Sequence, residues 1–258
     1  MDLAQLFDLT GKVALVTGGS RGIGEMIAHG LVAAGARVHV ASRKLEAVEA
    51  VAADLRAAGG EATAWRADLG TPEGCEALAR SIAEVAPSLH VLVNNAGATW
   101  GAPLGDHPAE GFDKVLDLNV RGVFLLTQAL LPQLEAAATP EDPARVINVG
   151  SVDGIQVPAF DSFGYGASKA AVHHLTRHVG KVVAARHITV NAVAPGLFPS
   201  KMTAHLLDHE EQIAAGIPRG RLGTAEDIAG TVVYLASRAG AYTTGVVLPV
   251  DGGVATLR

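Results

Sequence analysis

Tyr165 and Lys169 are the residues whose types and spacing first indicate chemistry. Four positions apart on a helix, their side chains lie on one face, where an ammonium group can approach a phenol. A free phenol has a pKa of about 10, too high for ready proton exchange at neutral pH, and a nearby ammonium favours the phenolate and lowers that pKa. Such a pair could serve a reaction that moves a proton to or from an oxygen. An isolated pair of this spacing would instead favour a plain contact on a helix surface.

Ser151 follows a short apolar run, Val146–Val149, that is typical of a buried strand. Open α/β sheets bind ligands at the carboxyl ends of their strands, so a hydroxyl at this point can hold a substrate oxygen while negative charge develops on it. A serine that merely ends a strand in a turn is the simpler alternative. The interval of fourteen residues from Ser151 to Tyr165 predicts a loop that bulges.

A glycine-rich stretch, Thr17–Gly24, separates the first apolar run from the first helical stretch. Glycine at positions 18, 22 and 24 allows a tight turn, close approach of a ligand, and close packing of helix on strand. The start of the following helix offers free backbone N–H groups and partial positive charge, which suit a pyrophosphate. An ordinary strand–helix turn would explain a lone glycine cluster, but the position after the first strand favours a nucleotide site.

The end of the second predicted strand indicates which dinucleotide binds. Folds that prefer NAD place an acidic residue there to bond the ribose hydroxyls, whereas this chain has Ser42-Arg43-Lys44. Arg43 and Arg21 could each donate two parallel hydrogen bonds to a 2′-phosphate. The alternative is that Arg43 and Lys44 only begin a solvated helix. We therefore expect NADP(H) as the cofactor.

Short β-branched runs alternate along the chain with longer, alanine-rich stretches that are typical of helices. Strands are expected at Val13–Thr17, Arg37–Ala41, Ala62–Ala67, Val91–Val93, Val146–Val149, Ile188–Val193 and Val246–Val250. Helices are expected at Ile23–Ala34, Leu45–Ala58, Pro72–Val85, Phe112–Leu118, Val120–Ala137, Tyr165–Ala185 and Ala225–Ala236. The alternation predicts an α/β fold: a single Rossmann-type, doubly wound parallel sheet of about seven strands with helices on both faces. We expect one domain over residues 1–258, with residues 196–224 forming a lid over the site.

Composition and charge exclude several classes of protein. Apolar residues make up 49% of the chain and charged residues 18%, which excludes intrinsic disorder. The net charge of −6 argues against a nucleic-acid partner. The single cysteine, Cys75, excludes an internal disulfide and any C-x-x-C site. The N-terminus has no signal-peptide pattern and no apolar run reaches about 18 residues, so we expect a cytoplasmic protein with no membrane partner.

Several motifs occur in the order found in short-chain dehydrogenases/reductases, and the resemblance covers nearly the whole chain. The motifs are Thr17–Gly24, Asn94–Gly97, Asn119, Ser151, Tyr165-x-x-x-Lys169 and Pro195-Gly196. The resemblance implies that Tyr165 is the general acid in carbonyl reduction and the base in alcohol oxidation, and that Lys169 bonds the nicotinamide ribose. It also implies that Asn119 steadies a water and proton relay near Lys169. A buried amide that bonds helix backbone is the other interpretation of Asn119, and both can hold.

The same resemblance implies a set of cofactor contacts. They are expected from Gly18, Ser20, Arg21, Gly22, Ile23, Gly24, Ser42, Arg43, Asp68, Leu69, Asn95, Ala96, Gly97, Tyr165, Lys169, Pro195, Gly196 and Ser200. Asp68 resembles the residue beside the adenine ring, and the segment from Pro195 to Ser200 resembles the one that cups the nicotinamide carboxamide. Many relatives carry threonine where Ser200 falls, and a serine hydroxyl can substitute.

Within the family, the sequence most resembles NADPH-dependent 3-oxoacyl reductases, including the rhamnolipid-pathway type. The fragments that carry this resemblance are residues 18–24, 95–101, 195–203 and 240–245. It implies reduction of a 3-oxoacyl thioester to a 3-hydroxyacyl thioester. An apolar lid would suit the acyl chain by hydrophobic burial. Its members are Leu197, Phe198, Met202, Leu206 and Leu207.

One departure leaves the substrate open. Relatives that use a carrier protein often place basic residues near the helix end at Ala137, but this chain has Glu135, Glu141 and Asp142 there. Acyl carrier proteins are acidic, so like charges would weaken docking. Arg186 remains as a candidate contact. An acyl carrier protein is therefore one candidate partner, and coenzyme A esters, sugars, polyols, steroids and small ketones stay as alternative substrates.

Two other classes of protein could share these motifs. A non-catalytic NADP-binding sensor or scaffold could use the same fold, but the intact catalytic set argues against it. A nucleotide-sugar epimerase usually needs a larger C-terminal domain than the residues after Pro195 supply. No metal site is expected, although histidines gather at 173–178 and 205–209. The family resemblance implies a homotetramer.

Overall fold

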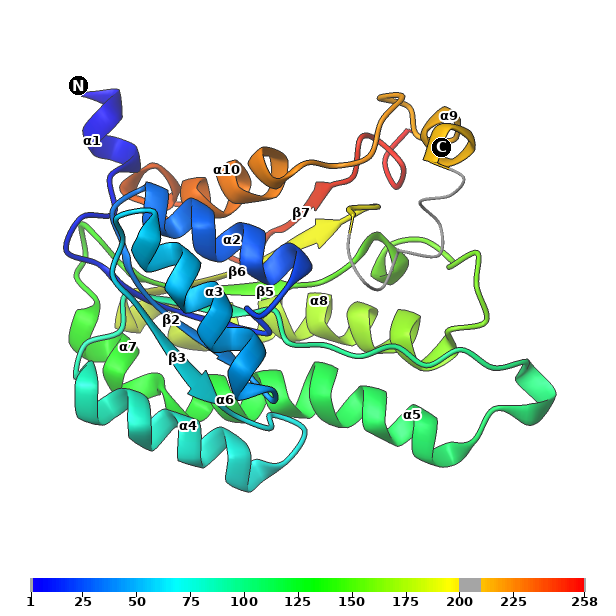
Figure 1. Ribbon diagram of the computed structural model, residues 1–258, viewed down its shortest axis with the longest axis horizontal. Helices are drawn as coiled ribbons and strands as arrows, with labels where there is room; N and C mark the ends of the chain where they lie inside the picture. Colours follow the sequence, from blue (N-terminus) through cyan, green and yellow to red (C-terminus); the bar gives the residue numbers. More distant parts are fainter. Residues whose placement is uncertain (1, 200–209, 258) are drawn as a thin grey trace.

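The computed structural model describes residues 2–199 and 210–257, and its centre is a parallel sheet covered by helices (Figure 1). The strands are β1 (Val13–Thr17), β2 (Arg37–Ser42), β3 (Ala62–Arg66), β4 (Val91–Asn94), β5 (Ala144–Val149), β6 (Ile188–Pro195) and β7 (Val247–Val250). They form one 7-stranded sheet in the order β3-β2-β1-β4-β5-β6-β7, and every neighbouring pair is parallel. The predicted fold class is therefore confirmed.

The central strands are apolar on both sides because helices cover both faces of the sheet. All five residues of β1 are buried. β1 pairs with β2 on one side, where Ala14 aligns with Val38, and with β4 on the other, where Ala14 aligns with Val91. The strand order reverses between β1 and β4. Ligands of open α/β sheets bind at such a point, outside the carboxyl ends of the strands.

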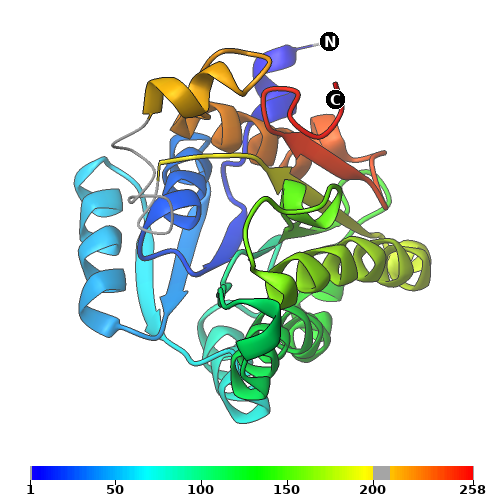
Figure 2. The same ribbon diagram turned by 90° about the vertical axis from the view of Figure 1, so that its right-hand side faces the viewer.

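Helices form a layer on each face (Figures 1 and 2). One layer packs a hydrophobic core with α2 (Gly22–Ala33), α3 (Leu45–Ala57) and α10 (Ala225–Ala236). The other packs a second core with α4 (Pro72–Val85), α6 (Val123–Ala129), α7 (Leu131–Ala137) and α8 (Phe163–Val183). The described chain also contains α1 (Leu3–Phe7), α5 (Ala109–Leu116) and α9 (Glu210–Ala215), and 3-10 turns at Leu104–Asp106, Val152–Gly154, Ala184–Arg186 and Arg238–Gly240.

The stretch from residue 109 to residue 137 differs from the two predicted helices, Phe112–Leu118 and Val120–Ala137. α5 continues through a π-helical turn, η2 (Asp117–Gly122), into α6, and the chain then bends by 55° before α7. Pro132 explains the bend, since proline lacks an N–H and fits only the first turn of a helix. Among the described helices, none alone is long and apolar enough to cross a membrane, and this bent run passes that test only as a pair, by length and composition.

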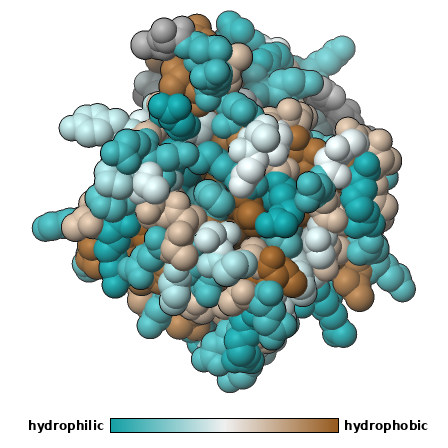
Figure 3. All heavy atoms as spheres, turned by 90° about the vertical axis from the view of Figure 1, so that its left-hand side faces the viewer, coloured by the Kyte–Doolittle hydropathy of each residue, from teal (hydrophilic) through white to brown (hydrophobic). Residues whose placement is uncertain are grey.

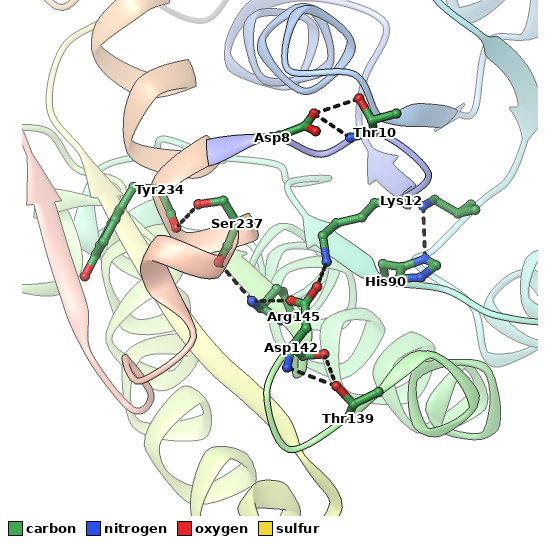
Figure 4. Close-up of polar contacts among 10 residues, drawn as sticks. Asp8, Thr10, Lys12, His90, Thr139, Asp142, Arg145, Tyr234 and Ser237 are labelled. Atoms are coloured by element: carbon green, nitrogen blue, oxygen red, sulfur yellow. Dashed lines mark hydrogen bonds and ion pairs between the residues drawn. The ribbon is translucent and has the colours of Figure 1, made fainter. Parts of the chain in front are cut away.

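At the amino ends of the strands, a buried ionic network joins β1, β5 and the segment after α10 (Figure 4). Asp142 accepts hydrogen bonds from Lys12 Nζ and, at 2.9 Å, from Arg145 Nη2, which also donates to the carbonyl oxygen of Ser237 at 2.8 Å. Burial acts to raise the pKa of Asp142, but the two cations more than offset it and leave the pKa lowered. The molecular face on the left of Figure 1, seen directly in Figure 3, mixes hydrophilic and hydrophobic side chains. The network links the segment before β1 to β5 and to the segment after α10.

Candidate active site

The carboxyl ends of the strands meet at one edge of the sheet, and predicted site residues follow six of them. They are Gly18–Gly24 after β1, Ser42-Arg43 at the end of β2, Asp68-Leu69 beyond β3, Asn95–Gly97 after β4, Ser151 after β5 and Pro195-Gly196 at the end of β6. Asn119 reaches this edge from η2, and Tyr165 and Lys169 reach it from α8. The predicted residue Ser200, and residues 200–209 of the predicted lid, lie outside the described residues.

Glycine lets the turn between β1 and α2 pack tightly on the segment after β4. Gly18 has a φ of +64°, a left-handed conformation that side chains rarely adopt. A Cβ on Gly18 would lie 2.8 Å from the Cα of Ala96, and a Cβ on Gly24 would overlap the side-chain amide of Asn95. The spacing of the glycines therefore has a structural reason beside the predicted ligand.

Asn95 and Thr17 tie this glycine loop to the end of β4. Asn95 Nδ2 donates to the carbonyl oxygens of Thr17 (2.9 Å) and Gly18 (3.1 Å). In return, Thr17 Oγ1 accepts the backbone N–H groups of Asn95 and Ala96, each at 3.0 Å. The Asn95 amide is thus used within the protein, where it fixes the two segments that a dinucleotide would lie between.

The start of α2 and two arginines fit an anionic ligand. Arg21 precedes α2, and no side chain of the described chain caps the first N–H groups of that helix. Arg21 and Arg43 are exposed, and neither makes an ion pair with another described residue. The Ser42 hydroxyl donates to the carbonyl oxygen of Lys44 at 3.1 Å and braces the turn that carries Arg43. Free N–H groups and guanidinium groups suit phosphates.

Asn119 is buried in the π-helical turn and holds the segment after β4. Its Nδ2 donates to the carbonyl oxygen of Ala98 and to Ser168 Oγ, both at 2.9 Å, and its Oδ1 accepts the Ala98 N–H at 2.8 Å. The Asn119 amide is therefore buried and bonds backbone, but this backbone belongs to the loop segment after β4 and not to a helix. A Cβ on Gly97 would lie 3.3 Å from Asn119 Oδ1 and 3.7 Å from Lys169 Nζ, so these three residues meet at one point.

Lys169 is buried on α8, and its ammonium points toward the end of β5. Nζ donates to the carbonyl oxygen of Val149 at 2.7 Å. Within the described chain it makes no ion pair with a carboxylate. Burial lowers the pKa of Lys169 to about 8, because the charged ammonium loses its hydration. A lysine in this state can hold or release a proton close to neutral pH.

Tyr165 lies one turn before Lys169, and Lys169 Nζ is 5.5 Å from the centre of its ring. The predicted lowering of the Tyr165 pKa by this ammonium is wrong. Burial raises the pKa of Tyr165 to about 12 because it penalises the phenolate; a hydrogen bond with Ser151 acts in the opposite direction, and the Asp153 carboxylate adds to the rise. Desolvation is the largest cause of this shift, and the Lys169 ammonium is not among the charges that change the pKa of Tyr165.

Ser151 begins the 3-10 turn Val152–Gly154, and its Oγ accepts the backbone N–H of Asp153 at 3.1 Å. The serine is thus held at the end of β5 beside Tyr165. Asp153 itself is a residue that the sequence analysis missed. Its side chain is half-buried, and burial raises its pKa. The sequence does show a carboxylate two positions after Ser151, and this spacing could have indicated that Asp153 lies near the site.

His173, one turn beyond Lys169, is a second missed residue. Its ring packs beneath the Ser151 turn: a Cβ on Gly150 would overlap its Nε2, and a Cβ on Gly154 would lie 2.8 Å from its Cε1. Burial lowers the pKa of His173 to about 4, so the imidazole is neutral at pH 7. The glycines on both sides of Ser151 signal a close neighbour, but the sequence does not say which one.

Metal chemistry has little support in the described part of the chain. No group of three His, Cys, Asp or Glu side chains there could hold a metal ion. The first group of histidines, residues 173–178, lies on α8. The second group, residues 205–209, lies outside the described residues.

Comparison with known proteins shows the family to which this chain belongs. The sequence profile of the short chain dehydrogenase family matches residues 12–211. The chain belongs to the short-chain dehydrogenase family. A rhamnolipids biosynthesis 3-oxoacyl-[acyl-carrier-protein] reductase from Pseudomonas aeruginosa is 48% identical over 250 residues, which cover 96% of this chain and 97% of the relative. The predicted family is confirmed, and this short-chain dehydrogenase is an oxidoreductase.

Solved structures of other short-chain dehydrogenases have the same fold. The Pseudomonas aeruginosa RhlG/NADP active-site complex has a TM-score of 0.94 at 48% identity, covering 97% of this chain and 99% of its own. A gluconate 5-dehydrogenase from Burkholderia cenocepacia J2315, in complex with NADP and tartrate, has a TM-score of 0.90 at 30% identity and covers 98% of both chains. The short-chain dehydrogenases that resemble this chain are therefore named for very different substrates, a 3-oxoacyl thioester in one case and gluconate in another.

Proposed function

We propose that this short-chain dehydrogenase is an NADPH-dependent reductase that converts a 3-oxoacyl thioester to a 3-hydroxyacyl thioester. The observation that carries the proposal is the group of Ser151, Tyr165 and Lys169 at the carboxyl edge of the sheet. The substrate class is taken from the Pseudomonas aeruginosa 3-oxoacyl-[acyl-carrier-protein] reductase, which matches 96% of the chain at 48% identity.

NADP(H) would be held along the carboxyl edge. Arg43 and Arg21 would pair with the 2′-phosphate, and the start of α2 would bind the pyrophosphate. Asp68 and Leu69 would flank the adenine, and the remaining predicted cofactor residues would line the path to the nicotinamide. When bound, NADPH supplies the hydride to the substrate carbonyl carbon. The NADP complexes of similar short-chain dehydrogenases support this choice.

Tyr165 donates the proton that the substrate oxygen takes up. Its pKa of about 12 keeps the phenol protonated at neutral pH, so the acid is ready before the reaction. Ser151 donates a hydrogen bond to the same oxygen as its negative charge grows. The Lys169 ammonium stabilises the phenolate that remains and, with its pKa of about 8, can return a proton to it. Asn119 holds the Ala98 segment against Lys169 and steadies the proton relay.

Tyr165→Phe tests the acid directly. The variant should lose about 100-fold or more in NADPH consumption, because the aromatic ring remains but the proton is gone, while binding of NADPH measured by fluorescence titration is retained. Tyr234→Phe is a matched control, since the Tyr234 hydroxyl contacts Thr243 Oγ1 at 2.9 Å, away from the catalytic group. Full turnover by Tyr165→Phe would refute the role of this residue as the acid.

The thioester carrier depends on surface charge. Arg186, the candidate contact for an acyl carrier protein, pairs with Glu135 at 2.8 Å. Asp142 is already bonded to Arg145 in the ionic network at the amino edge. An acidic carrier protein would therefore compete with an existing pair, which favours coenzyme A esters as the first substrates to assay. A panel of 3-oxoacyl-coenzyme A, 3-oxoacyl carrier protein, sugars and small ketones separates the alternatives, and turnover of a gluconate-type sugar alone would overturn the thioester proposal.

The remaining parts of the proposal concern organisation. The chain would act as one domain over residues 1–258, with a lid at about 196–224, as a cytoplasmic homotetramer. Exposed Phe124 on α6 and Val182 on α8 are apolar side chains on the two helices through which the family tetramer is expected to pack, and they support this arrangement. Light scattering of the purified protein tests it, since a monomer would contradict the tetramer.

A further inference from the structure

The acyl chain of the proposed substrate needs an apolar surface, and Phe198 of the predicted lid is not free to supply it. Phe198 is buried in the core between the sheet and the α2–α10 layer. A Cβ on Gly223 would overlap its ring, so Phe198 is already packed. Three of the other predicted lid residues, Met202, Leu206 and Leu207, lie outside the described residues. Within the described chain, other segments near the catalytic group also expose apolar side chains.

Two segments beside the catalytic group, residues 98–108 and 155–163, expose apolar side chains, and we call these segments the two loops. We call their exposed apolar residues the mouth patch: Leu104, Ile155, Val157, Phe160 and Phe163. Val157 is 90% exposed, Leu104 78% and Phe160 58%. Exposed apolar residues are ordinary when scattered singly, but a group of them on adjoining segments marks a binding surface.

The chain itself fixes the mouth patch next to the reacting groups. Ile155 follows Ser151 by four residues, and Phe163 precedes Tyr165 by two. Both loops project together past the carboxyl edge of the sheet, at the right of Figure 1 and toward the viewer in Figure 2. A molecule that places its carbonyl at Tyr165 therefore has this patch within reach of its tail.

Contacts between the two loops join the patch into one surface. The backbone N–H of Ala102 donates to the carbonyl oxygen of Asp161 at 3.1 Å. The rings of His107 and Phe163 meet edge to face with centres 6.1 Å apart, and His107 meets Phe112 of α5 in the same manner. The loop before α8 is held too, since a Cβ on Gly166 would lie 3.0 Å from Pro158.

Charge distinguishes among the molecules that could cover this surface. Residues 98–108 and 155–163 contain no lysine or arginine, and their charged residues are Asp106 and Asp161, both exposed. These carboxylates disfavour an anionic membrane surface or an acidic carrier protein. They impose no such cost on an uncharged alkyl chain, which gains free energy from any apolar area that it covers.

We propose that the mouth patch binds the alkyl tail of a 3-oxoacyl thioester, so that the enzyme prefers medium-length and long chains. The inference rests on the proposed thioester activity. A methylene that moves fully from water to an apolar site gains about fourfold in binding, and one half-covered on an open surface gains about twofold. The value of kcat/KM should therefore rise about twofold per methylene along the chain series.

Chain-length dependence tests the proposal. We would measure kcat/KM for the series from acetoacetyl-coenzyme A to 3-oxodecanoyl-coenzyme A with the full-length enzyme. The wild-type ratio between the two ends should be about 50-fold, and Val157→Ser/Phe160→Ser should reduce that ratio to about fivefold or less. Leu104→Ser, on the other loop, should reduce it by a smaller factor. Leu3→Ser/Phe7→Ser on α1 is the matched control, because it removes exposed apolar side chains far from the loops and should leave the ratio unchanged.

The outcomes separate this proposal from the one on which it rests. Absence of turnover with every thioester would overturn the proposed function itself. Turnover with no rise along the series, or a rise that Val157→Ser/Phe160→Ser does not change, would overturn the mouth patch alone. If that variant changes the oligomeric state in light scattering while the ratio stays at the wild-type value, the patch is a subunit contact and the acyl assignment is wrong.

Discussion

Two lysines are buried at opposite ends of the same sheet, and their surroundings differ. Lys12, 8% exposed at the amino edge, is paired with Asp142, which also binds Arg145. Lys169, 5% exposed at the carboxyl edge, has the carbonyl oxygen of Val149 as its acceptor and a pKa lowered to about 8. A carboxylate compensates for the cost of burying a cation, whereas a carbonyl does so only in part. The amino edge is therefore built to hold the fold, and the carboxyl edge keeps an uncompensated charge that can serve proton transfer.

Asp142→Asn should give the largest effect, because it leaves two buried cations without their carboxylate. We expect a loss of about 3–5 kcal/mol in the free energy of unfolding, with kcat of the folded enzyme unchanged within about twofold. Urea denaturation followed by circular dichroism measures the loss. Glu135→Gln is the control, since it breaks the exposed Glu135–Arg186 pair and should cost less than about 1 kcal/mol. Equal costs for the two variants would show that the network does not stabilise the amino edge.

Lys169→Met should have the opposite profile. We expect kcat to fall by about 100-fold, roughly 3 kcal/mol in the activation barrier, while the free energy of unfolding stays the same or rises because an uncompensated buried charge is gone. Lys12→Met is the matched control: it should reduce stability and leave kcat of the folded enzyme intact. Steady-state kinetics and urea denaturation of both variants give the four values. If each variant lost stability and kcat in parallel, the distinction between the two edges would fail.

The sequence predicts the strands well because they follow local apolar patterns, and the same reasoning places the proposed catalytic set at the ends of these strands. β1 and β5 are apolar runs, and the residues that follow them are placed by the topology of a parallel sheet. The pKa of Tyr165 could not be predicted in the same way, since it depends on how deeply the phenol is buried and on Asp153, which comes from another segment. The π-helical turn around Asn119 could not be predicted for a similar reason. The Asn119 amide bonds the backbone of Ala98, and the periodicity of the helix does not reveal that contact.

Gly150→Ala should have an intermediate effect at the carboxyl edge. The new methyl group would overlap the His173 ring, and overpacking of this kind costs about 1–3 kcal/mol. The adjacent Ser151 should shift with its backbone, so kcat should fall as well. In Gly150→Ala/His173→Ala the ring is absent, and stability and kcat should both recover relative to Gly150→Ala alone. A double-mutant cycle on unfolding free energies measures the coupling, and strictly additive losses would mean that His173 does not support the Ser151 turn.

The pH dependence of stability is the smallest expected difference between the two edges. The pKa of Lys169 is about 8 in the folded protein, below its ordinary value of 10.5, so the unfolded chain binds more protons between these values. Its contribution to the free energy of unfolding therefore rises with pH in that window, by about 1 kcal/mol from pH 8 to pH 9. Asp142 has a lowered pKa, so its contribution is present above its ordinary value of 3.8 and is lost only as the pH falls below it.

Urea denaturation without nucleotide, at pH 8 and at pH 9, isolates the lysine if each variant is subtracted from the wild type. The difference between wild type and Lys169→Met should grow in favour of the wild type by about 1 kcal/mol over this interval, because only the wild type releases a destabilising proton. A constant difference for Lys169→Met over this interval would mean that its ammonium is hydrated, and a hydrated ammonium could not make the carboxyl edge the more reactive of the two.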